Sequence, residues 1–397
     1  MDRTGRIGFV TPRYGDEVIG GAEAAMREAA HGLAERGWEV EILTTCARDH
    51  FTWANEYDEG ATTDGDVLIR RFPAVIDTPR VERAEIEAAI LAGDRPPIEL
   101  QQRWINDDLR VPGLYHHLLD TAEGYRALVF APYLFWPTFA CAQVAPGRSI
   151  LMPCLHDEPH AQLEVFDPVF TGVRGLWFLS DPERDLAARR HPGLADHEVV
   201  GSGVDVPESY DPDGFRKRYG IDGRFLYYAG RREGGKNWER LLEGFSIAVR
   251  RADLPFSLVT SGTGPVDPPT SIADRVIDLG FLSVDERNSA FAAADAYLQP
   301  SAYESFSRTI MEAWLAETLP VANAASAVVT WHMDRAASGL AYDDDFELEQ
   351  CLRFVAEAPD EARALARVGR EYVLGNYTWD PVLDRMEATL DKWLPAS

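Results

Sequence analysis

Two glutamates lie eight positions apart in the stretch YESFSRTIMEAW, residues 303–314. On one continuous helix, Glu304 and Glu312 would lie about 80° apart around the axis. However, the preceding AYLQPS is typical of a short strand that ends in a turn, and Ser305 or Ser307 fits the capping position of a new helix. We therefore expect Glu304 in a loop and Glu312 in the helix, as two carboxylates that can accept hydrogen bonds from sugar hydroxyls.

Two cations occur in YYAGRREGGKNW, residues 227–238, which follows a predicted strand and opens a predicted helix. The stretch nearly matches the phosphate loop G-x-x-x-x-G-K-[ST], but Asn237 replaces the hydroxyl residue that would ligate magnesium. This substitution disfavours phosphate-loop chemistry with a metal. Arg231 and Lys236 at a helix N-terminus still favour binding of a diphosphate.

A glycine pair, Gly20 and Gly21, follows the first predicted strand in VIGGAEAAM. Glycines at the start of a helix let backbone amides approach an anion closely. The stretch lacks the G-x-G-x-x-G pattern of dinucleotide-binding loops, so it gives little support to a nicotinamide cofactor.

One histidine, His156, ends a predicted strand in LMPCLHDEPHAQ, residues 151–162. With His160 it has the i, i+4 spacing of a metal pair, but Pro159 interrupts a helix there and no third ligand is evident. A partly buried structural histidine is a second interpretation. We favour a third, a polar catalytic loop in which His156 bonds to a substrate hydroxyl. The D-x-D triplets elsewhere are expected by chance in so acidic a chain.

The composition limits the classes of partner. The chain has 397 residues, with 39 basic and 65 acidic residues and a formal charge of −26. Such a charge repels nucleic acid and anionic lipid, so we expect no nucleic-acid partner and at most peripheral membrane association. The N-terminus has no signal-peptide pattern, and the four scattered cysteines are typical of reduced, buried thiols. These features predict a cytoplasmic protein.

Strand and helix patterns alternate in two series, which predicts an α/β protein with two doubly wound domains. We expect an N-terminal domain over residues 1–200, with a polar helical insertion at about 78–125, and a C-terminal domain over 201–375. VVGSGVDVPE is the predicted hinge between them. An amphipathic helix, TWDPVLDRMEATLDKWL, is expected within 376–397.

Taken together, GGAE, LHDEP, GVDVP, YYAGRREGGKN and PSAYESFSRTIMEAWLAETLPV resemble the retaining glycosyltransferases of family 4 over nearly the whole chain. This resemblance implies the GT-B fold, two Rossmann-like domains facing across a cleft, with the C-terminal helix crossing back to the N-terminal domain. In that family the first glutamate contacts the donor sugar and the second contacts the nucleotide ribose, which would be Glu304 and Glu312. Arg231 and Lys236 would hold the donor diphosphate, and His156 would lie beside the transferred sugar.

The resemblance also implies that Gly20 and Gly21 approach the phosphates, as do the amides of Phe306 and Ser307. Ser307 departs from the family pattern, which often has glycine there. No metal or other cofactor is expected. The donor would be a nucleotide-diphosphate-sugar, and the acceptor a sugar, a lipid-linked molecule or a small molecule, in polysaccharide, cell-envelope glycan or glycoconjugate synthesis.

Other functional classes remain open. A non-catalytic GT-B module would bind a nucleotide-sugar without turnover. A GT-B epimerase would convert the donor without an acceptor. A phosphorylase would need a lysine for pyridoxal phosphate, and the sequence singles none out.

The glycosyltransferase reaction that the resemblance implies keeps the anomeric configuration of the sugar. No carboxylate pair is placed for a double displacement.

Overall fold

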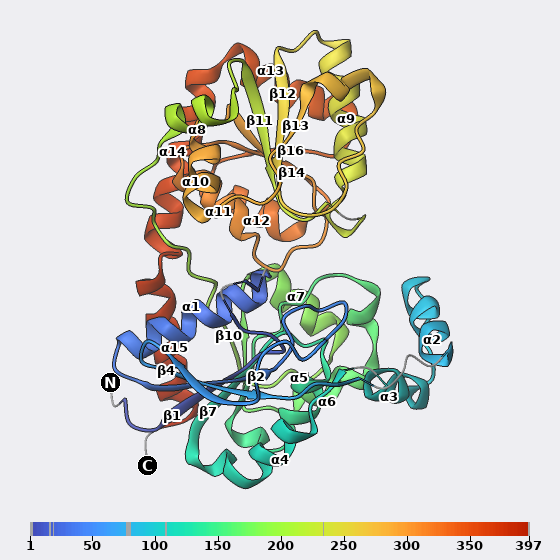
Figure 1. Cartoon of the computed structure of the whole chain (residues 1–397), viewed down its shortest axis with the longest axis vertical. Helices are drawn as coiled ribbons and strands as arrows, with labels where there is room; N and C mark the ends of the chain where they lie inside the picture. Colours follow the sequence, from blue (N-terminus) through green and yellow to red (C-terminus); the bar gives the residue numbers. More distant parts are fainter. Residues whose placement is uncertain are drawn as a thin grey trace. The chain divides into compact units, whose positions relative to one another are not determined.

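The computed structural model describes residues 3–15, 17–18, 20–76, 81–107, 109–232 and 234–395. The chain divides into two compact units (Figure 1). Unit 1 comprises Met1–Gly203 and Trp379–Ser397, and unit 2 comprises Val204–Thr378. The boundary at Gly203 falls within the segment VVGSGVDVPE.

Unit 1 is built, within its described residues, on an eight-stranded sheet in the order β10-β9-β8-β7-β1-β2-β4-β3. Its strand pairs are parallel apart from the antiparallel pair of β3 with β4. The strands are β1 (Arg6–Val10), β2 (Glu39–Thr45), β3 (Gly60–Asp64), β4 (Val67–Phe72), β7 (Tyr125–Phe130), β8 (Ser149–Leu151), β9 (Gly175–Phe178) and β10 (His197–Val199).

The helices of unit 1 mostly connect these strands, as parallel pairing requires. They are α1 (Gly21–Glu35), α2 (Val81–Leu91), α3 (Ile98–Asn106), α4 (Pro112–Thr121), α5 (Trp136–Cys141), α6 (Asp167–Thr171), α7 (Asp181–Arg190) and α15 (Trp379–Trp393). The short strands β5 (Val75–Ile76) and β6 (Leu109–Arg110) pair with each other, and short 3-10 turns complete the loops, among them η3 (Pro159–Gln162).

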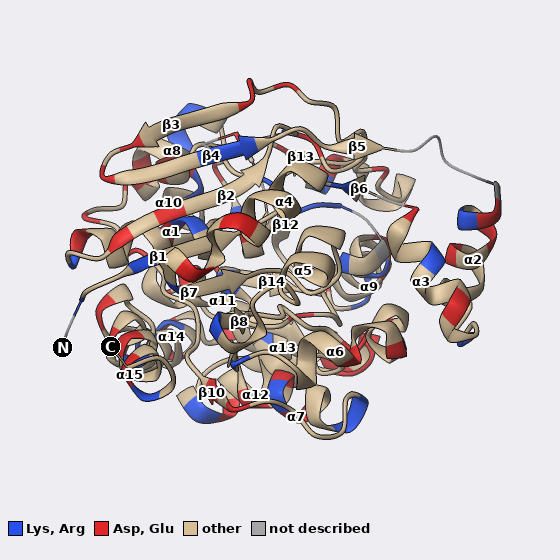
Figure 2. Ribbon diagram, turned by 90° about the horizontal axis from the view of Figure 1, so that it is seen from below, with Lys and Arg blue, Asp and Glu red and all other residues tan. Residues whose placement is uncertain are grey.

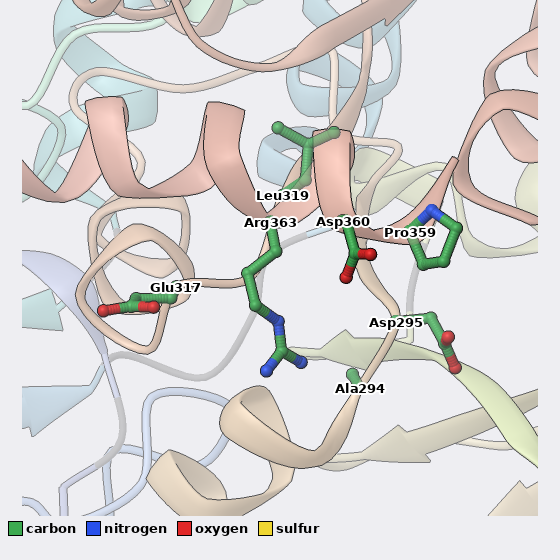
Figure 3. A pocket seen from close by; sticks show the side chains of 7 residues that line it. All are labelled: Ala294, Asp295, Glu317, Leu319, Pro359, Asp360 and Arg363. Atoms are coloured by element: carbon green, nitrogen blue, oxygen red, sulfur yellow. The ribbon is translucent and has the colours of Figure 1, made fainter.

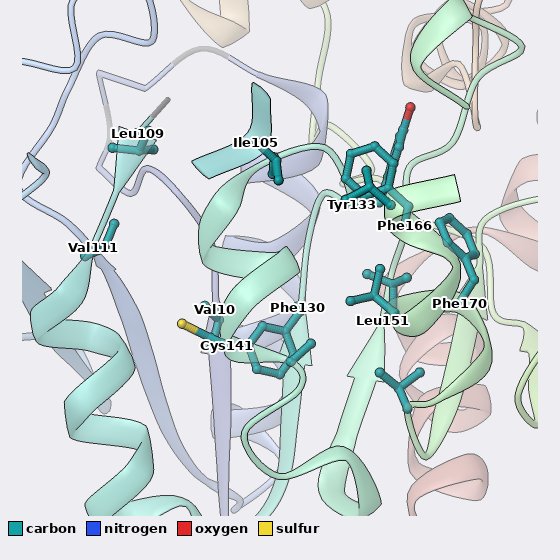
Figure 4. Packing of buried hydrophobic residues seen from close by; sticks show 14 of the residues in the cluster. Val10, Ile105, Leu109, Val111, Phe130, Tyr133, Cys141, Leu151, Phe166 and Phe170 are labelled. Atoms are coloured by element: carbon teal, nitrogen blue, oxygen red, sulfur yellow. The ribbon is translucent and has the colours of Figure 1, made fainter. Parts of the chain in front are cut away.

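The core of unit 1 gathers side chains from the sheet and from the segment between β4 and β7. Figure 4 shows Val10, Phe130 and Leu151 from the strands beside the rings of Phe166 and Phe170. The predicted insertion contributes to the same core, because Leu109, Val111, Leu114 and Leu118 are all fully buried. Its polar sequence reflects the outer faces of α2, α3 and α4, while Ile90, Trp104 and Leu114 on these helices belong to the core cluster.

The last helix, α15, completes unit 1. It buries Val382, Leu383, Met386, Leu390 and Trp393, which is the apolar face that the sequence predicts. Packing against the sheet is close, since a Cβ added to Gly175 would lie 2.5 Å from the Trp393 ring. Glu387 is 1% exposed and accepts hydrogen bonds from Arg3, Arg36 and Trp38 at 2.7–2.8 Å. An ionic contact thus fixes the helix as well as apolar packing.

Unit 2 has, among the residues described, a six-stranded parallel sheet in the order β13-β12-β11-β14-β15-β16. The strands are β11 (Arg224–Ala229), β12 (Phe256–Ser261), β13 (Val276–Asp278), β14 (Ala296–Gln299), β15 (Pro320–Asn323) and β16 (Leu340–Tyr342). The helices are α8 (Pro212–Tyr219), α9 (Trp238–Arg251), α10 (Val284–Ala293), α11 (Arg308–Leu315), α12 (Ala327–Ala336), α13 (Asp345–Glu357) and α14 (Pro359–Asn376), with the 3-10 turns η5 (Gly234–Lys236) and η6 (Thr270–Arg275).

The predicted doubly wound α/β architecture is confirmed in each unit by these parallel sheets and connecting helices. Charged residues of both signs occur on many helices, as α2 and α7 illustrate (Figure 2). The four cysteines are unpaired; Cys46, Cys141 and Cys154 are buried as predicted, whereas Cys351 is partly exposed. In the described part of the chain, no helix has both the length and the apolar character needed to cross a bilayer.

Glu387 should be the main polar anchor of α15. Burial by itself raises its pKa, but hydrogen bonds from Arg3, Trp38 and Arg36 outweigh burial and leave the pKa below the ordinary value of 4.5. We expect Glu387→Gln to lower the free energy of unfolding by about 2–3 kcal/mol at neutral pH, because it loses charged hydrogen bonds. Since this contribution is present above pH 4.5 and lost as the pH falls through the lowered pKa, the two proteins should converge in acid.

The measurement is urea unfolding across pH, with Asp384→Asn as the control. Asp384 also pairs with Arg36, at 2.7 Å, but is 68% exposed, so its loss should cost at most about 1 kcal/mol. Equal losses for the two variants would contradict the buried-anchor role of Glu387.

Candidate functional site

The sheet of unit 2 has a point at which the direction of strand addition reverses. The chain places β12 and β13 on one side of β11, and β14, β15 and β16 on the other. The loops that follow β11 and β14 therefore leave neighbouring strands at the same edge and diverge. In open α/β sheets this is the place where ligands bind. The sequence-predicted residues of unit 2 lie on these two loops or at the helices that they open.

Hydrogen bonds to residues of β11 and β12 hold the loop after β11. The Tyr228 hydroxyl donates to the carbonyl of Arg231 at 2.6 Å, and the amide of Gly230 donates to Ser261 at 3.0 Å. The two adjacent arginines differ in their surroundings. Arg232 is 5% exposed and donates to the carbonyls of Gly262 and Gly264, whereas Arg231 is exposed. Arg232 is thus a structural residue, and Arg231 is the one of the pair with access to a ligand.

Lys236 ends the short turn η5, directly before helix α9. The next residue, Asn237, is the N-cap of α9 and has φ 54°, a left-handed conformation that asparagine tolerates better than most residues. Its side-chain amide donates to the carbonyl of Pro300 at 3.1 Å, and Asn323 donates to the same oxygen at 3.0 Å. Asn237 thereby ties the loop after β11 to the end of β14, a structural role that accounts for the departure from the phosphate-loop pattern.

An ion pair joins the two loops at the reversal point. Lys236 Nζ lies 2.8 Å from Glu304 Oε1, with 30% of the lysine side chain and 12% of the glutamate side chain exposed. Glu304 lies in the loop after β14, outside any helix, as the sequence predicts. The structure therefore brings together two of the predicted residues that stand 68 positions apart.

Helix α11 begins after Ser307, which is its N-cap, but the serine side chain does not cap the helix. Ser307 has φ 65°, the left-handed region in which glycine is preferred. Its hydroxyl instead accepts a hydrogen bond from Gln299 at 2.8 Å. Glycine adopts this conformation without strain, and this chain has serine there.

The ring of Phe306 anchors the same loop. It is 3% exposed and packs edge-on against His332 and Tyr377, each with ring centroids 5.0 Å away. His332 is fully buried, which lowers its pKa to about 3, so it stays neutral in this apolar cluster. The amides of Phe306 and Ser307 therefore lie on a loop whose position is fixed by its own buried ring.

Glu312 lies within α11, as predicted, and 12% of its side chain is exposed. Its Oε1 accepts a hydrogen bond from Arg287 of α10 at 2.8 Å. Within the described residues its Oε2 is buried without a hydrogen-bond partner. Sequence reasoning missed Arg287, because no motif surrounds it and its contact depends on which helices become neighbours.

In unit 1 the strand order also reverses, between β1 and β7. Gly20 is the N-cap of α1 after β1 and Gly21 is its first residue. The two glycines differ. A Cβ on Gly20 would lie 2.1 Å from Oε2 of Glu23, a buried carboxylate that pairs with Arg13. A Cβ on Gly21 would have no neighbour within 4 Å. Gly20 is therefore explained by a contact within the protein, and Gly21 leaves space at the helix N-terminus.

His156 lies in the loop after β8, and 34% of its side chain is exposed. Its Nδ1 is 3.7 Å from Glu158 Oε1, which also accepts a hydrogen bond from the buried Tyr133 hydroxyl at 2.9 Å. Burial by itself raises the pKa of Glu158, but His156 and Tyr133 outweigh it and lower the pKa. A carboxylate beside Nδ1 favours a proton on that nitrogen, which leaves Nε2 as an acceptor for a substrate hydroxyl.

His160 contacts residues of helices α2 and α3. It pairs with Glu87 of α2 at 3.1 Å and stacks on Trp104 of α3. The two histidines thus have different partners, so the interpretation as a metal pair finds no support. Among the described residues, no group of three or more His, Cys, Asp or Glu side chains is arranged to hold a metal.

A pocket of about 160 Å³ lies elsewhere in unit 2 (Figure 3). Ala294 and Asp295 precede β14, and Leu319 precedes β15, so the pocket is at the amino edge of the sheet, opposite the predicted residues. The Asp295 carboxylate already forms an ion pair with Arg224, with 2.7 Å between Oδ1 and Nε. The remaining lining residues are Glu317, Pro359, Asp360 and Arg363.

Comparisons with known proteins agree with this geometry. The family model described as "Glycosyl transferases group 1" matches residues 223–352. The matched residues lie within unit 2. A curated relative, mannosylfructose-phosphate synthase from Agrobacterium fabrum, is 24% identical over 219 residues, and the match covers 47% of each chain. The chain thus matches about half the length of that relative.

Solved structures extend the likeness to nearly the whole chain. Sucrose-phosphate synthase from Thermosynechococcus elongatus has a TM-score of 0.75 at 17% identity, covering 99% of this chain and 100% of the other. HepE from Anabaena, solved in complex with UDP and glucose, has a TM-score of 0.72 at 15% identity, covering 98% and 100%. The fold is GT-B, as the sequence predicts. At these identities the likeness establishes the fold alone.

The left-handed backbone at Ser307 can be tested directly in the loop between β14 and α11. We expect Ser307→Gly to be more stable than Ser307→Ala by about 1–2 kcal/mol, because both lose the bond from Gln299 but only glycine relieves the left-handed strain. Urea unfolding of the two variants measures the difference. Alanine equal to or better than glycine would show that the loop does not hold this conformation.

Proposed function

We propose that this protein is a glycosyltransferase that moves a sugar from a nucleotide-diphosphate-sugar to a hydroxyl of an acceptor. The observation that carries the proposal is the Lys236–Glu304 ion pair at the reversal point of the unit 2 sheet, with Arg231 on the same loop as the lysine. A cation and a carboxylate meet where two helices, α9 and α11, begin. This combination suits a ligand that has both an anionic diphosphate and sugar hydroxyls.

The roles of the residues in unit 2 follow from their chemistry. Arg231 and Lys236 would hold the diphosphate and stabilise the negative charge that grows on it as the sugar departs. Glu304 would accept hydrogen bonds from the donor sugar. Glu312, whose second oxygen is buried without a described partner, would accept them from the ribose diol. The amides of Phe306 and Ser307 would add donors to the phosphates, because that loop opens α11.

The roles in unit 1 concern the acceptor and the transferred sugar. His156, with Glu158 beside Nδ1, would accept a hydrogen bond from a sugar or acceptor hydroxyl through Nε2. Gly21 leaves space for a close approach to the α1 amides, with Gly20 as its N-cap. The residues named here would do without a metal, because arginine, lysine and helix amides supply the positive charge. We further propose that the anomeric configuration of the sugar is retained.

Uridine nucleotides are the first donors to test, because HepE was solved with UDP and with UDP-glucose. Two acceptor classes deserve comparison. One comprises growing glycans and lipid-linked sugars, as the family resemblance suggests. The other comprises sugar phosphates, since two of the similar proteins are named as synthases of phosphorylated disaccharides.

A panel of UDP-, GDP-, ADP- and TDP-sugars tests the proposal. We expect one nucleotide to stabilise the protein by about 2.7 kcal/mol at a hundred times its dissociation constant. With the matching sugar and an acceptor, the product should form with the anomeric configuration of the donor, which proton NMR of the anomeric signal reports. Binding without product in either acceptor class would favour a non-catalytic module, and a changed donor sugar without acceptor would favour an epimerase.

Lys236 should matter for turnover more than for folding. Replacing it with methionine removes a cation that strengthens its contact as the leaving group departs, so Lys236→Met should lower kcat about a hundredfold or more. Lys217→Met is the matched control, since Lys217 is an exposed lysine on α8 of the same unit and should be neutral. Near wild-type turnover of Lys236→Met with the identified donor would rule out the diphosphate role.

A further inference from the structure

Helix α7 of unit 1 starts with a Ser-x-x-Glu sequence, the pattern of a local capping box, and its glutamate has further contacts outside the cap. Ser180 is the N-cap, and its hydroxyl accepts a hydrogen bond from the Glu183 amide at 3.3 Å. In a capping box the glutamate side chain would return mainly to the N-cap amide. The same Ser-x-x-Glu spacing at α10 does so, because Glu286 accepts from the Ser283 amide at 3.1 Å.

The Glu183 carboxylate faces the Ser180 amide, as in a capping box, but it also joins two loops. Its Oε1 accepts a hydrogen bond from the amide of Leu155 at 2.7 Å, and its Oε2 accepts one from the amide of Leu179 at 2.6 Å. Glu183 is 1% exposed, so these amides take the place of water around the carboxylate. Burial raises its pKa to about 8, although the backbone amides that face it act in the opposite direction.

Leu155 directly precedes His156, so this contact fixes the candidate catalytic loop. The loop needs such a contact, because Cys154 adopts φ 54°, which is unfavourable for a residue with a side chain. On the other side of His156, Asp157 accepts a hydrogen bond from Arg190 at 2.7 Å. Glu183 near the start of α7 and Arg190 at its end therefore hold the residues on both sides of His156.

We propose that α7 is a positioning element for His156, with Glu183 as the principal positioning residue and Arg190 as a weaker one. The bond from the Leu155 amide to Glu183 fixes the backbone before His156. The bond from Arg190 to Asp157 fixes the residue after it. Burying a carboxylate is unfavourable in itself, and a local cap would not require it. The inference rests on the proposed function for its effect on transfer, but the positioning itself can be measured without any substrate.

The test compares Glu183→Gln with Glu41→Gln. Glutamine keeps the shape of Glu183 but turns one acceptor into a donor that faces a backbone amide. Glu41 is an equally buried carboxylate of the same unit, near the amino end of β2, and is held by Arg70 at 2.8 Å and Tyr125 at 2.6 Å. Both variants should lose stability in urea, so unfolding alone does not distinguish them.

The first readout is NMR of the histidine rings in the substrate-free protein, with His156→Ala used to assign its signal among the nine histidines. We expect Glu183→Gln to move or broaden the His156 signal. Glu41→Gln should leave that signal unchanged. An unchanged His156 signal in folded Glu183→Gln overturns the proposal.

The second readout is a double-mutant cycle on transfer. Glu183→Gln should lower kcat about 10- to 100-fold with little change in nucleotide affinity, because misplacement of a catalytic group is costly. In the His156→Ala background it should cost almost nothing more. An additive loss means that Glu183 acts in some other way and contradicts the proposal. A moved NMR signal in a protein that transfers no sugar supports positioning and defeats the proposed function instead.

If Glu183→Gln does not fold, Arg190→Ala tests the same positioning role of α7. The arginine side chain is 28% exposed and its Asp157 partner is 59% exposed, so the variant should remain folded. It should move the His156 signal in a smaller but measurable way. A His156 signal identical to wild type in Arg190→Ala would then contradict the proposal.

Discussion

In a parallel sheet all strands end at one edge, and where the order of strand addition reverses, two neighbouring loops diverge. Both units of this protein have such a reversal, between β11 and β14 in unit 2 and between β1 and β7 in unit 1. The diverging loops leave helix N-termini and backbone amides uncovered by a further crossover, which makes that edge the natural place for an anionic ligand. The rest of the candidate site depends on how these loops are held.

In unit 2 the loops are held by side chains that bind backbone groups of their neighbours. Asn237 and Asn323 share the carbonyl of Pro300, and Tyr228 holds the carbonyl of Arg231. These bonds satisfy loop carbonyls that no strand or helix can reach. They also leave Lys236 and Glu304 to pair with each other across the two loops. In a chain with a formal charge of −26, a local carboxylate partner keeps the cation in place without making the edge strongly basic.

The sequence predicted features that depend on local patterns. The strands β7 and β11 contain the apolar runs ALVF and FLYYA because both faces of a parallel sheet are covered, and such runs are recognisable without a structure. The placement of Glu304 in a loop and Glu312 in a helix followed from a turn and a capping residue. The two doubly wound domains followed from such patterns, whereas the GT-B fold was implied by the resemblance to a known family.

Features that depend on chain conformation or on distant neighbours could not be predicted. A serine gives no sign that its φ is 65°, so Ser307 was recognisable only as a departure from glycine. The contact of Arg287 with Glu312 requires α10 and α11 to be adjacent, which no spacing encodes. Glu183 is the clearest case, since its sequence context is that of a local cap, as at Glu286, and gives no sign of the added contact with the Leu155 amide.

The membership of α15 in unit 1 has a consequence for the order of folding during synthesis. Unit 2 is one continuous stretch, Val204–Thr378, whereas unit 1 requires both ends of the chain. A ribosome therefore synthesises all of unit 2 before it makes the helix that packs against Gly175 and Trp38. Domains tend to fold as they emerge from the ribosome. Until α15 is made, the N-terminal sheet therefore has an apolar face exposed to solvent and to chaperones. The first part of the protein to be made is thus the last to be finished.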